Sequence, residues 1–172
     1  MLTSTMTDQR KGSKTKLDRL FEIRDRQREA YEHGVVIIRG DELAWEQNDF
    51  GKTKWYMHPD IPNRSNSSFL FYSLEIPPGS RTGRMKTPGD EVVLFVEGEG
   101  YTEIDGIKHA WKAGDVLGLP MRQRPLVVQH FNSDKRRPAT LISARPNLVD
   151  ALGLDRGVGF ELLESAPESE RL

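Results

Sequence analysis

The chain has 172 residues, no cysteine and a formal net charge of −1. This length fits one domain with a sizeable core, and the absence of cysteine excludes disulfides and thiolate zinc sites. The near-neutral charge balance provides no broad basic surface for nucleic acid, and neither a membrane-spanning apolar run nor a signal-peptide pattern is present. We therefore expect a cytoplasmic protein that acts without nucleic acid or a membrane.

The N-terminal region divides into a polar tail and one helix. Residues 1–13 are polar, a composition typical of disorder. Residues 14–32 carry apolar side chains at steps of three and four without glycine or proline, which predicts an amphipathic helix within the segment 14–34. The apolar stripe includes Leu17, Leu20, Phe21 and Tyr31. Such a stripe needs a partner surface, so we expect it to dock on its own barrel or on a second subunit.

From residue 35 onward the pattern changes to short β-type runs separated by turn signals. Asp105-Gly106 between two such runs predicts a tight hairpin. Many short strands at close spacing are typical of an antiparallel sandwich or barrel. We expect this barrel over residues 35–155 and a C-terminal extension over 156–172, with an acidic, frayed end over 164–172. The expected strands cover residues 35–39, 53–58, 69–76, 92–96, 100–104, 108–111, 116–119, 127–132 and 139–144.

Two segments of this barrel match a known pair of motifs. Gly79, Glu91 and Gly98 keep the spacing of the pattern G-x5-H-x-H-x3-4-E-x6-G, and a second segment ends at Asn132 after a longer turn. These segments resemble the two motifs of the cupin superfamily. More loosely, residues 41–155 are similar to small single-domain cupins related to gentisate-type dioxygenases. The resemblance implies an all-β, double-stranded jelly-roll barrel preceded by the N-terminal helix.

Three of the four positions in which cupins place metal ligands hold residues that suit a metal poorly. The histidine slots fall on Met85, Thr87 and, counting back from Asn132, Val128; only Glu91 keeps its type. A thioether, a neutral hydroxyl and an aliphatic side chain do not make a first shell for a borderline divalent ion. We therefore expect a barrel without the usual metal triad and with no tightly bound metal cofactor.

A rebuilt metal site is the first alternative. His58 and His130 together with Glu91 would supply two histidines and one carboxylate, the ligand count of non-haem iron oxygenases. The protein would then be a dioxygenase-like oxidoreductase that uses Fe or another divalent metal. The remaining histidines, His33 and His109, are most simply structural.

Strand periodicity predicts which side chains face the barrel interior, because residues two apart lie on the same side of a sheet. The expected inward set is Met85, Thr87, Glu91, Val93, Phe95, Val128 and His130. Thr87 and Tyr101 are candidates to hydrogen-bond a ligand. A basic side chain such as Arg84, Lys86, Arg122 or Arg124 is a candidate to hold an acidic group.

Glu91 and His130 form the candidate catalytic pair. In a dry barrel without a cation, a carboxylate and an imidazole are expected to share a proton, as a protonated acid or as an ion pair with an imidazolium. General acid–base chemistry of a lyase or isomerase requires such a pair. In the simpler alternative, Glu91 forms a salt bridge with Arg81, Arg84 or Lys86 or is solvated by water at the rim of the barrel, and His130 satisfies a backbone group.

We expect from these residues a cupin barrel that binds or transforms a small aromatic or acidic molecule. A non-catalytic ligand sensor or structural cupin is a further alternative. Val92, Leu94 and Val96 are expected to form an apolar row on the outer sheet face. Exposed sheet edges and such a face favour pairing, so we expect a homodimer.

Overall fold

The computed structural model describes residues 14–61, 68–147 and 161–169. The expectations for the tail at 1–13 and for most of the segment between residues 147 and 160 lie outside the described residues. The described chain forms one helix and eleven strands. The helix belongs to one compact unit and the strands belong to another.

Helix α1 spans Lys16–His33, within two residues of the expected bounds. A capping box starts it: the Thr15 hydroxyl accepts the Asp18 N–H at 3.1 Å, and the Asp18 carboxylate accepts the Thr15 N–H at 2.8 Å. None of the helix residues is buried, and Phe21 and the other apolar side chains of the stripe are exposed. Docking of the stripe on a partner surface therefore stays a prediction. Within the described residues, no helix is long and apolar enough to cross a membrane.

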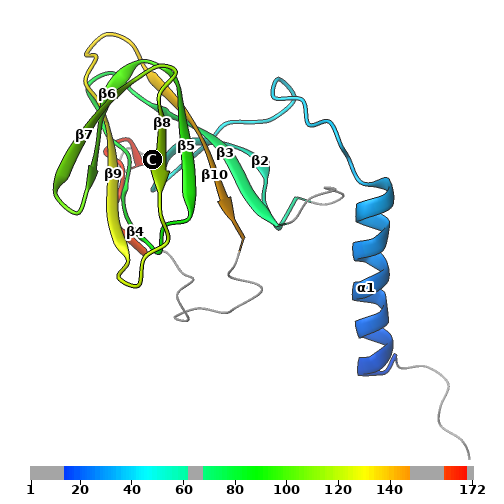
Figure 1. Ribbon diagram of the computed structural model, residues 1–172. Helices are drawn as coiled ribbons and strands as arrows, with labels where there is room; N and C mark the ends of the chain where they lie inside the picture. The colour runs from blue at the N-terminus through cyan, green and yellow to red at the C-terminus, as the bar shows by residue number, and fades with distance from the viewer. Residues whose placement is uncertain (1–13, 62–67, 148–160, 170–172) are drawn as a thin grey trace, which may run out of the picture. The chain divides into compact units, whose positions relative to one another are not determined.

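The strands form two antiparallel sheets that face each other, which confirms the all-β jelly-roll prediction (Figure 1). The first sheet has the order β1 (Glu46–Asn48), β2 (Gly51–Met57), β3 (Phe69–Ile76), β10 (Ala139–Pro146), β5 (Glu91–Glu97) and β8 (Val116–Leu119). The second sheet has the order β11 (Glu161–Glu164), β4 (Arg84–Thr87), β9 (Leu126–Asn132), β6 (Glu99–Ile104) and β7 (Ile107–Lys112).

The hairpin between β6 and β7 is confirmed. Ile104 lies opposite Ile107, and both turn residues are left-handed, with φ of 50° at Asp105 and 84° at Gly106. Two positive φ angles in a two-residue turn match the right-handed twist of the flanking strands, and glycine and aspartate tolerate them best.

The expected alternation of inward and outward side chains is confirmed in β5. Glu91, Val93 and Phe95 are buried, whereas the intervening side chains are exposed. The exposed row consists of Val92, Leu94 and Val96. The inward side chains join a core to which both sheets contribute. Its buried members are Tyr72, Leu74, Ile76, Val93, Phe95, Trp111, Ala139 and Leu141.

The expected strand at residues 35–39 is wrong. Val36 and Ile37 are 83% and 73% exposed, and the segment forms no named strand. A run of β-branched residues becomes a strand only when it packs against neighbours in a sheet, and this run lies before the sheets begin. The sequence did not predict strands β1 and β4, because both are short and polar. They form because each pairs with a neighbouring strand.

The expected frayed C-terminal end is also wrong for residues 164–169. Strand β11 pairs with β4, and Ala166 beyond it is fully buried and donates its N–H to the Asp49 carbonyl at 2.7 Å. The Ser80 hydroxyl also donates to the Glu168 carboxylate at 2.5 Å. This part of the expected extension therefore belongs to the barrel.

Candidate functional site

The positions that correspond to cupin histidines lie together on paired strands. Met85 of β4 lies opposite Val128 of β9, and Thr87 lies opposite Leu126. Thr87 and Val128 are buried, as expected for inward-facing residues, while Met85 is half-buried. The Thr87 hydroxyl accepts the Gly89 N–H at 3.3 Å. These side chains do not supply the nitrogen donors that a cupin metal would need.

Glu91 begins β5 and is 7% exposed. Its Oε1 accepts hydrogen bonds from the Ser143 hydroxyl at 2.5 Å and from the Tyr72 hydroxyl at 3.3 Å. Burial, together with the charge of Glu91, raises the pKa of Tyr72 above its usual range, so the phenol remains a donor. We call Glu91, Tyr72 and Ser143 the Glu91 cluster.

Arg145 adds a positive charge beside this cluster. It is half-buried and follows Leu141 and Ser143 on the inward-facing side of β10, opposite Leu70 of β3. Its charge opposes the rise in the pKa of Tyr72. Sequence reasoning missed Tyr72, Ser143 and Arg145, although the alternation within their strands was a usable signal.

His130 lies on β9 and is 4% exposed. Its Nδ1 is 2.8 Å from the Thr102 hydroxyl of β6, which also accepts the Trp111 indole N–H at 3.1 Å. Burial lowers the pKa of His130 to about 4, so the imidazole is neutral at pH 7. Its ring also meets the Phe95 ring edge-on, with centroids 6.0 Å apart. We call His130, Thr102 and Trp111 the His130 cluster.

Glu91 and His130 both lie on inward-facing positions but bond to separate partners. Among the described residues, no hydrogen bond joins them. His130 meets Phe95, which is four residues beyond Glu91 and therefore about 13 Å along an extended strand. Of the two shared-proton forms expected, the ion pair with an imidazolium is not favoured, because burial keeps His130 neutral.

The basic residues near Glu91 bind other carboxylates, so the expected salt bridge to Glu91 is wrong. Arg81 and Arg84 pair with Glu164 at 2.8 and 3.5 Å, and Lys86 pairs with Glu161 at 2.9 Å. Strand β11 provides both acids and lies beside β4. Arg84 is exposed and pairs with Glu164 of the neighbouring strand β11, so it does not share the buried position of Thr87 on β4.

Tyr101 does not face the interior. It alternates with the fully buried Thr102, stacks on Phe131 at a centroid distance of 4.6 Å, and lies under the Lys108 ammonium at 4.6 Å. Phe131 in turn alternates with buried His130. Tyr101 therefore belongs to the outer surface of the second sheet and is corrected as an interior candidate.

The rebuilt metal site is not assembled. His58 follows the end of β2, and its Nδ1 accepts the Asp60 N–H at 3.2 Å. Across residues 14–61, 68–147 and 161–169, no three His, Asp or Glu side chains are grouped as a metal site requires. His33 and His109 are exposed, in agreement with their assignment outside the site.

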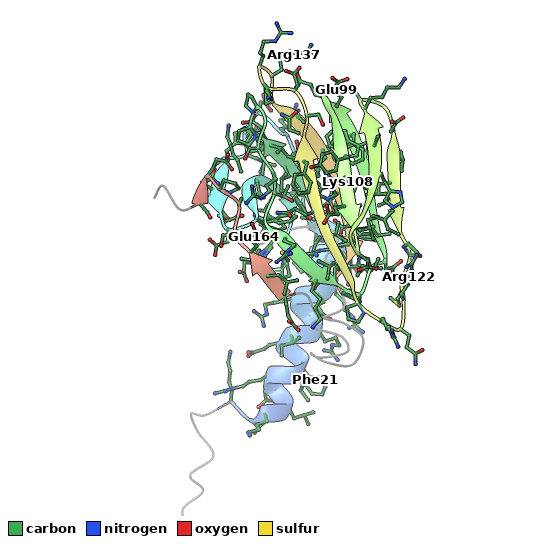
Figure 2. All side chains as sticks on the ribbon, turned by 90° about the vertical axis from the view of Figure 1, so that its left-hand side faces the viewer. Phe21, Glu99, Lys108, Arg122, Arg137 and Glu164 are labelled. Atoms are coloured by element: carbon green, nitrogen blue, oxygen red, sulfur yellow. The ribbon has the colours of Figure 1, made fainter. Side chains whose placement is uncertain are left out.

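A surface cavity of about 270 Å³ lies at the far end of β5 from Glu91. It is lined by Glu97, Gly98, Glu99, Lys112, Ala113, Arg137 and Pro138. Figure 2 shows Glu99 and Arg137 at one end of the barrel and Arg122, which is exposed, at the other. The cavity includes none of the candidate residues, so we place the candidate site in the barrel interior instead.

Solved structures with the same fold are cupin-like proteins. A cupin-like protein from Thermotoga maritima is 20% identical, with coverage of 80% of this chain and 95% of that one and a TM-score of 0.52. A double-stranded β-helix protein from Klebsiella pneumoniae is also 20% identical, over 76% and 99% of the two chains, with a TM-score of 0.53. The polyketide cyclase RemF from Streptomyces resistomycificus is 12% identical over 65% and 79%, with a TM-score of 0.53.

No family model and no curated protein matches the chain. The likeness to solved structures shows that the chain has the cupin-type double-stranded β-helix fold. At these identities it establishes the fold, and the function must be argued from the site.

Proposed function

We propose that this protein binds a small aromatic or acidic molecule in the barrel interior and acts on it without the cupin metal triad. The observation that carries the proposal is the presence of two polar clusters among apolar inward-facing side chains. Glu91 and His130 are more than nine-tenths buried and are each fixed by hydroxyl groups on one side. Burying titratable groups costs free energy that hydrogen bonds only partly offset, and buried titratable groups with perturbed pKa values are concentrated at functional sites.

The chemistry that these groups support is acid–base chemistry. The Glu91 carboxylate can accept a proton from a ligand, the Tyr72 phenol can donate a hydrogen bond to developing negative charge, and neutral His130 can hold a polar group of the ligand. Arg145 lies near Tyr72 and supplies the positive charge that an acidic ligand needs. We propose a lyase or isomerase reaction, with Met85, Thr87, Phe95 and Val128 as the wall of the site.

The fold neighbours do not choose between an enzyme and a sensor. They include a polyketide cyclase and a predicted oxalate decarboxylase, so the same barrel accommodates different reactions. A sensor would hold its ligand unchanged.

Mass spectrometry of the untagged protein, purified and then denatured, tests the proposal by identifying a co-purified ligand. We expect Glu91→Gln to keep the ligand bound and to abolish its turnover, and His130→Gln to weaken its binding. Matched controls are Glu97→Gln at the other end of β5 and His109→Gln on exposed β7. Loss of ligand in both controls would contradict the assignment of the site.

Metal analysis of the same sample tests the oxygenase alternative. Near-stoichiometric iron, manganese, nickel or zinc that resists mild chelation and is released by His130→Ala would overturn the metal-free proposal. A ligand recovered chemically unchanged from wild type and from Glu91→Gln alike would support the sensor instead.

We also propose a homodimer that buries the exposed row on the first sheet. Val92, Leu94 and Val96 are joined by Val116, which lies opposite Leu94 on the edge strand β8. An apolar face beside a free edge favours self-association. Light scattering should show a dimer that Leu94→Lys converts to a monomer, whereas Ile107→Lys on the second sheet leaves it intact. A wild-type monomer at micromolar concentration would contradict this.

A further inference from the structure

The His130 ring is held from one side by a row of side chains on three neighbouring strands. Thr102 of β6 lies opposite His130 of β9, and Trp111 comes from β7. The Trp111 N–H is 3.1 Å from the Thr102 hydroxyl, which is 2.8 Å from His130 Nδ1. All three side chains are buried, so water does not compete for these bonds.

The directions of these hydrogen bonds follow from the number of protons available. An indole N–H can only donate, so the Thr102 oxygen is the acceptor in the first bond. Thr102 is fully buried, and within the described chain its hydroxyl proton has no acceptor other than His130 Nδ1. If Nδ1 carried the ring proton instead, that hydroxyl proton would be unpaired, at a cost of about 1–3 kcal/mol.

The remaining ring nitrogen therefore carries the proton. A neutral imidazole has one donor and one acceptor, so an accepting Nδ1 implies a donating Nε2–H. No hydrogen bond from Nε2 is found among the described residues, and the nearby Phe95 and Thr102 provide no further acceptor. The His130 ring is 4% exposed, and an Nε2–H with no partner among the described residues is suited to an acceptor atom that is not part of this chain.

We propose that Thr102, fixed by Trp111, locks His130 as the Nε2–H tautomer, so that His130 donates a hydrogen bond to a carboxylate or carbonyl oxygen of the ligand. Thr102 is then a positioning residue and His130 is the residue that contacts the ligand. The role of the ligand oxygen rests on the proposed function, whereas the tautomer is a property of the ligand-free protein. Ligand groups that can only donate, such as an ammonium, are excluded at this position.

Nitrogen-15 NMR of the full chain tests the tautomer directly, because protonated and unprotonated ring nitrogens have distinct resonances. We expect His130 to show a protonated Nε2 and an unprotonated Nδ1 in wild type and in Thr102→Ser. In Thr102→Val, which lacks the hydroxyl, the other tautomer should become populated. Thr53→Val is the matched control, since Thr53 is fully buried on the first sheet and bonds to Asn48.

An Nδ1–H tautomer in wild type overturns the proposal, and an unchanged Nε2–H tautomer in Thr102→Val overturns the role of Thr102. If Thr102→Val does not fold, Trp111→Phe gives the second test, because it keeps a ring and removes the donor that fixes Thr102. An unchanged Nε2–H tautomer in Trp111→Phe would show that Trp111 does not fix Thr102.

Benzoate and benzylammonium, which differ in the group attached to one ring, test the class of ligand. Benzoate should shift the His130 Nε2 signal in wild type and bind about tenfold more weakly to Thr102→Val, equivalent to about 1.4 kcal/mol. A shift caused by benzylammonium overturns the donor role. If neither probe nor a co-purified ligand binds while the Nε2–H tautomer is present, the proposed function fails and the role of Thr102 stands.

Discussion

The two polar clusters of the barrel interior stabilise a buried titratable side chain in different ways. The Glu91 cluster, on the first sheet, supplies two hydroxyl donors to one carboxylate oxygen. The His130 cluster, on the second sheet, supplies one hydroxyl to a ring that burial keeps neutral. A buried polar group must be paired or uncharged. The first cluster should therefore be sensitive to loss of donors, and the second to pH.

Removal of Phe95 should have the largest effect on stability, and it tests the His130 cluster. Phe95 is fully buried, stacks on Trp111 with centroids 4.0 Å apart, and meets His130. Phe95→Ala should lower the free energy of unfolding by about 3–5 kcal/mol in urea titrations. Phe69→Ala, at an exposed phenylalanine, is the control and should cost much less. Equal losses would show that the stacked pair does not hold the His130 cluster.

Acid should destabilise the protein through His130. Its pKa is about 4 in the folded protein against 6.5 when unperturbed, so the unfolded chain binds more protons between these values. Stability is then fully present above about pH 6.5 and falls as the pH decreases toward 4, by up to roughly 3 kcal/mol.

The variant His130→Gln should flatten this part of the curve of unfolding free energy against pH. His109→Gln should leave it unchanged, because His109 is exposed. A wild-type curve that is flat between pH 6.5 and 4 would contradict a buried neutral imidazole.

Removing a hydrogen-bond donor from the Glu91 cluster should lower the free energy of unfolding, and the loss should be greater for the shorter hydrogen bond. Ser143→Ala leaves a buried carboxylate with one donor fewer, which costs about 1.5–3 kcal/mol. Tyr72→Phe removes the longer bond and should cost less, about 1 kcal/mol. Thermal unfolding measures both, with Ser133→Ala at an exposed serine as the control. The reverse order would mean that the phenol is the main partner of Glu91.

The smallest effect is expected at the ion pairs outside the interior. Glu164→Gln removes the carboxylate that Arg81 and Arg84 share, yet all three side chains are about 40% exposed. Solvent screens such pairs, so the variant should cost about 1 kcal/mol or less, and added salt should reduce the difference from wild type. A loss of stability as large as that of Ser143→Ala would show that these ion pairs contribute as much to stability as the interior clusters do.

The parts of the site that follow from local pattern could be predicted. Motif spacing located Glu91, and the period of two along the strands assigned Glu91, Phe95 and His130 to the interior, where the structure has them. Both features depend on residues a few positions apart.

The partners of those residues could not be predicted, because they depend on strand register between distant segments. Ser143 and Glu91 are 52 residues apart, and Tyr72 and Glu91 are 19 apart. Tyr101 was misplaced because its parity in β6 is set by the hairpin register with β7. Strand β11 has no β-type pattern, and its partner β4 lies far away in the sequence: Glu161 is opposite Lys86, 75 residues earlier.

Strand β11 also protects the barrel from association with other chains. Without it, β4 would be the last strand of the second sheet and would present unpaired N–H and C=O groups. Such an edge is a template for intermolecular β-pairing and aggregation. A chain cut before Glu161 would therefore lose solubility as well as stability, and a bulky fusion placed directly at Glu164 would carry the same risk.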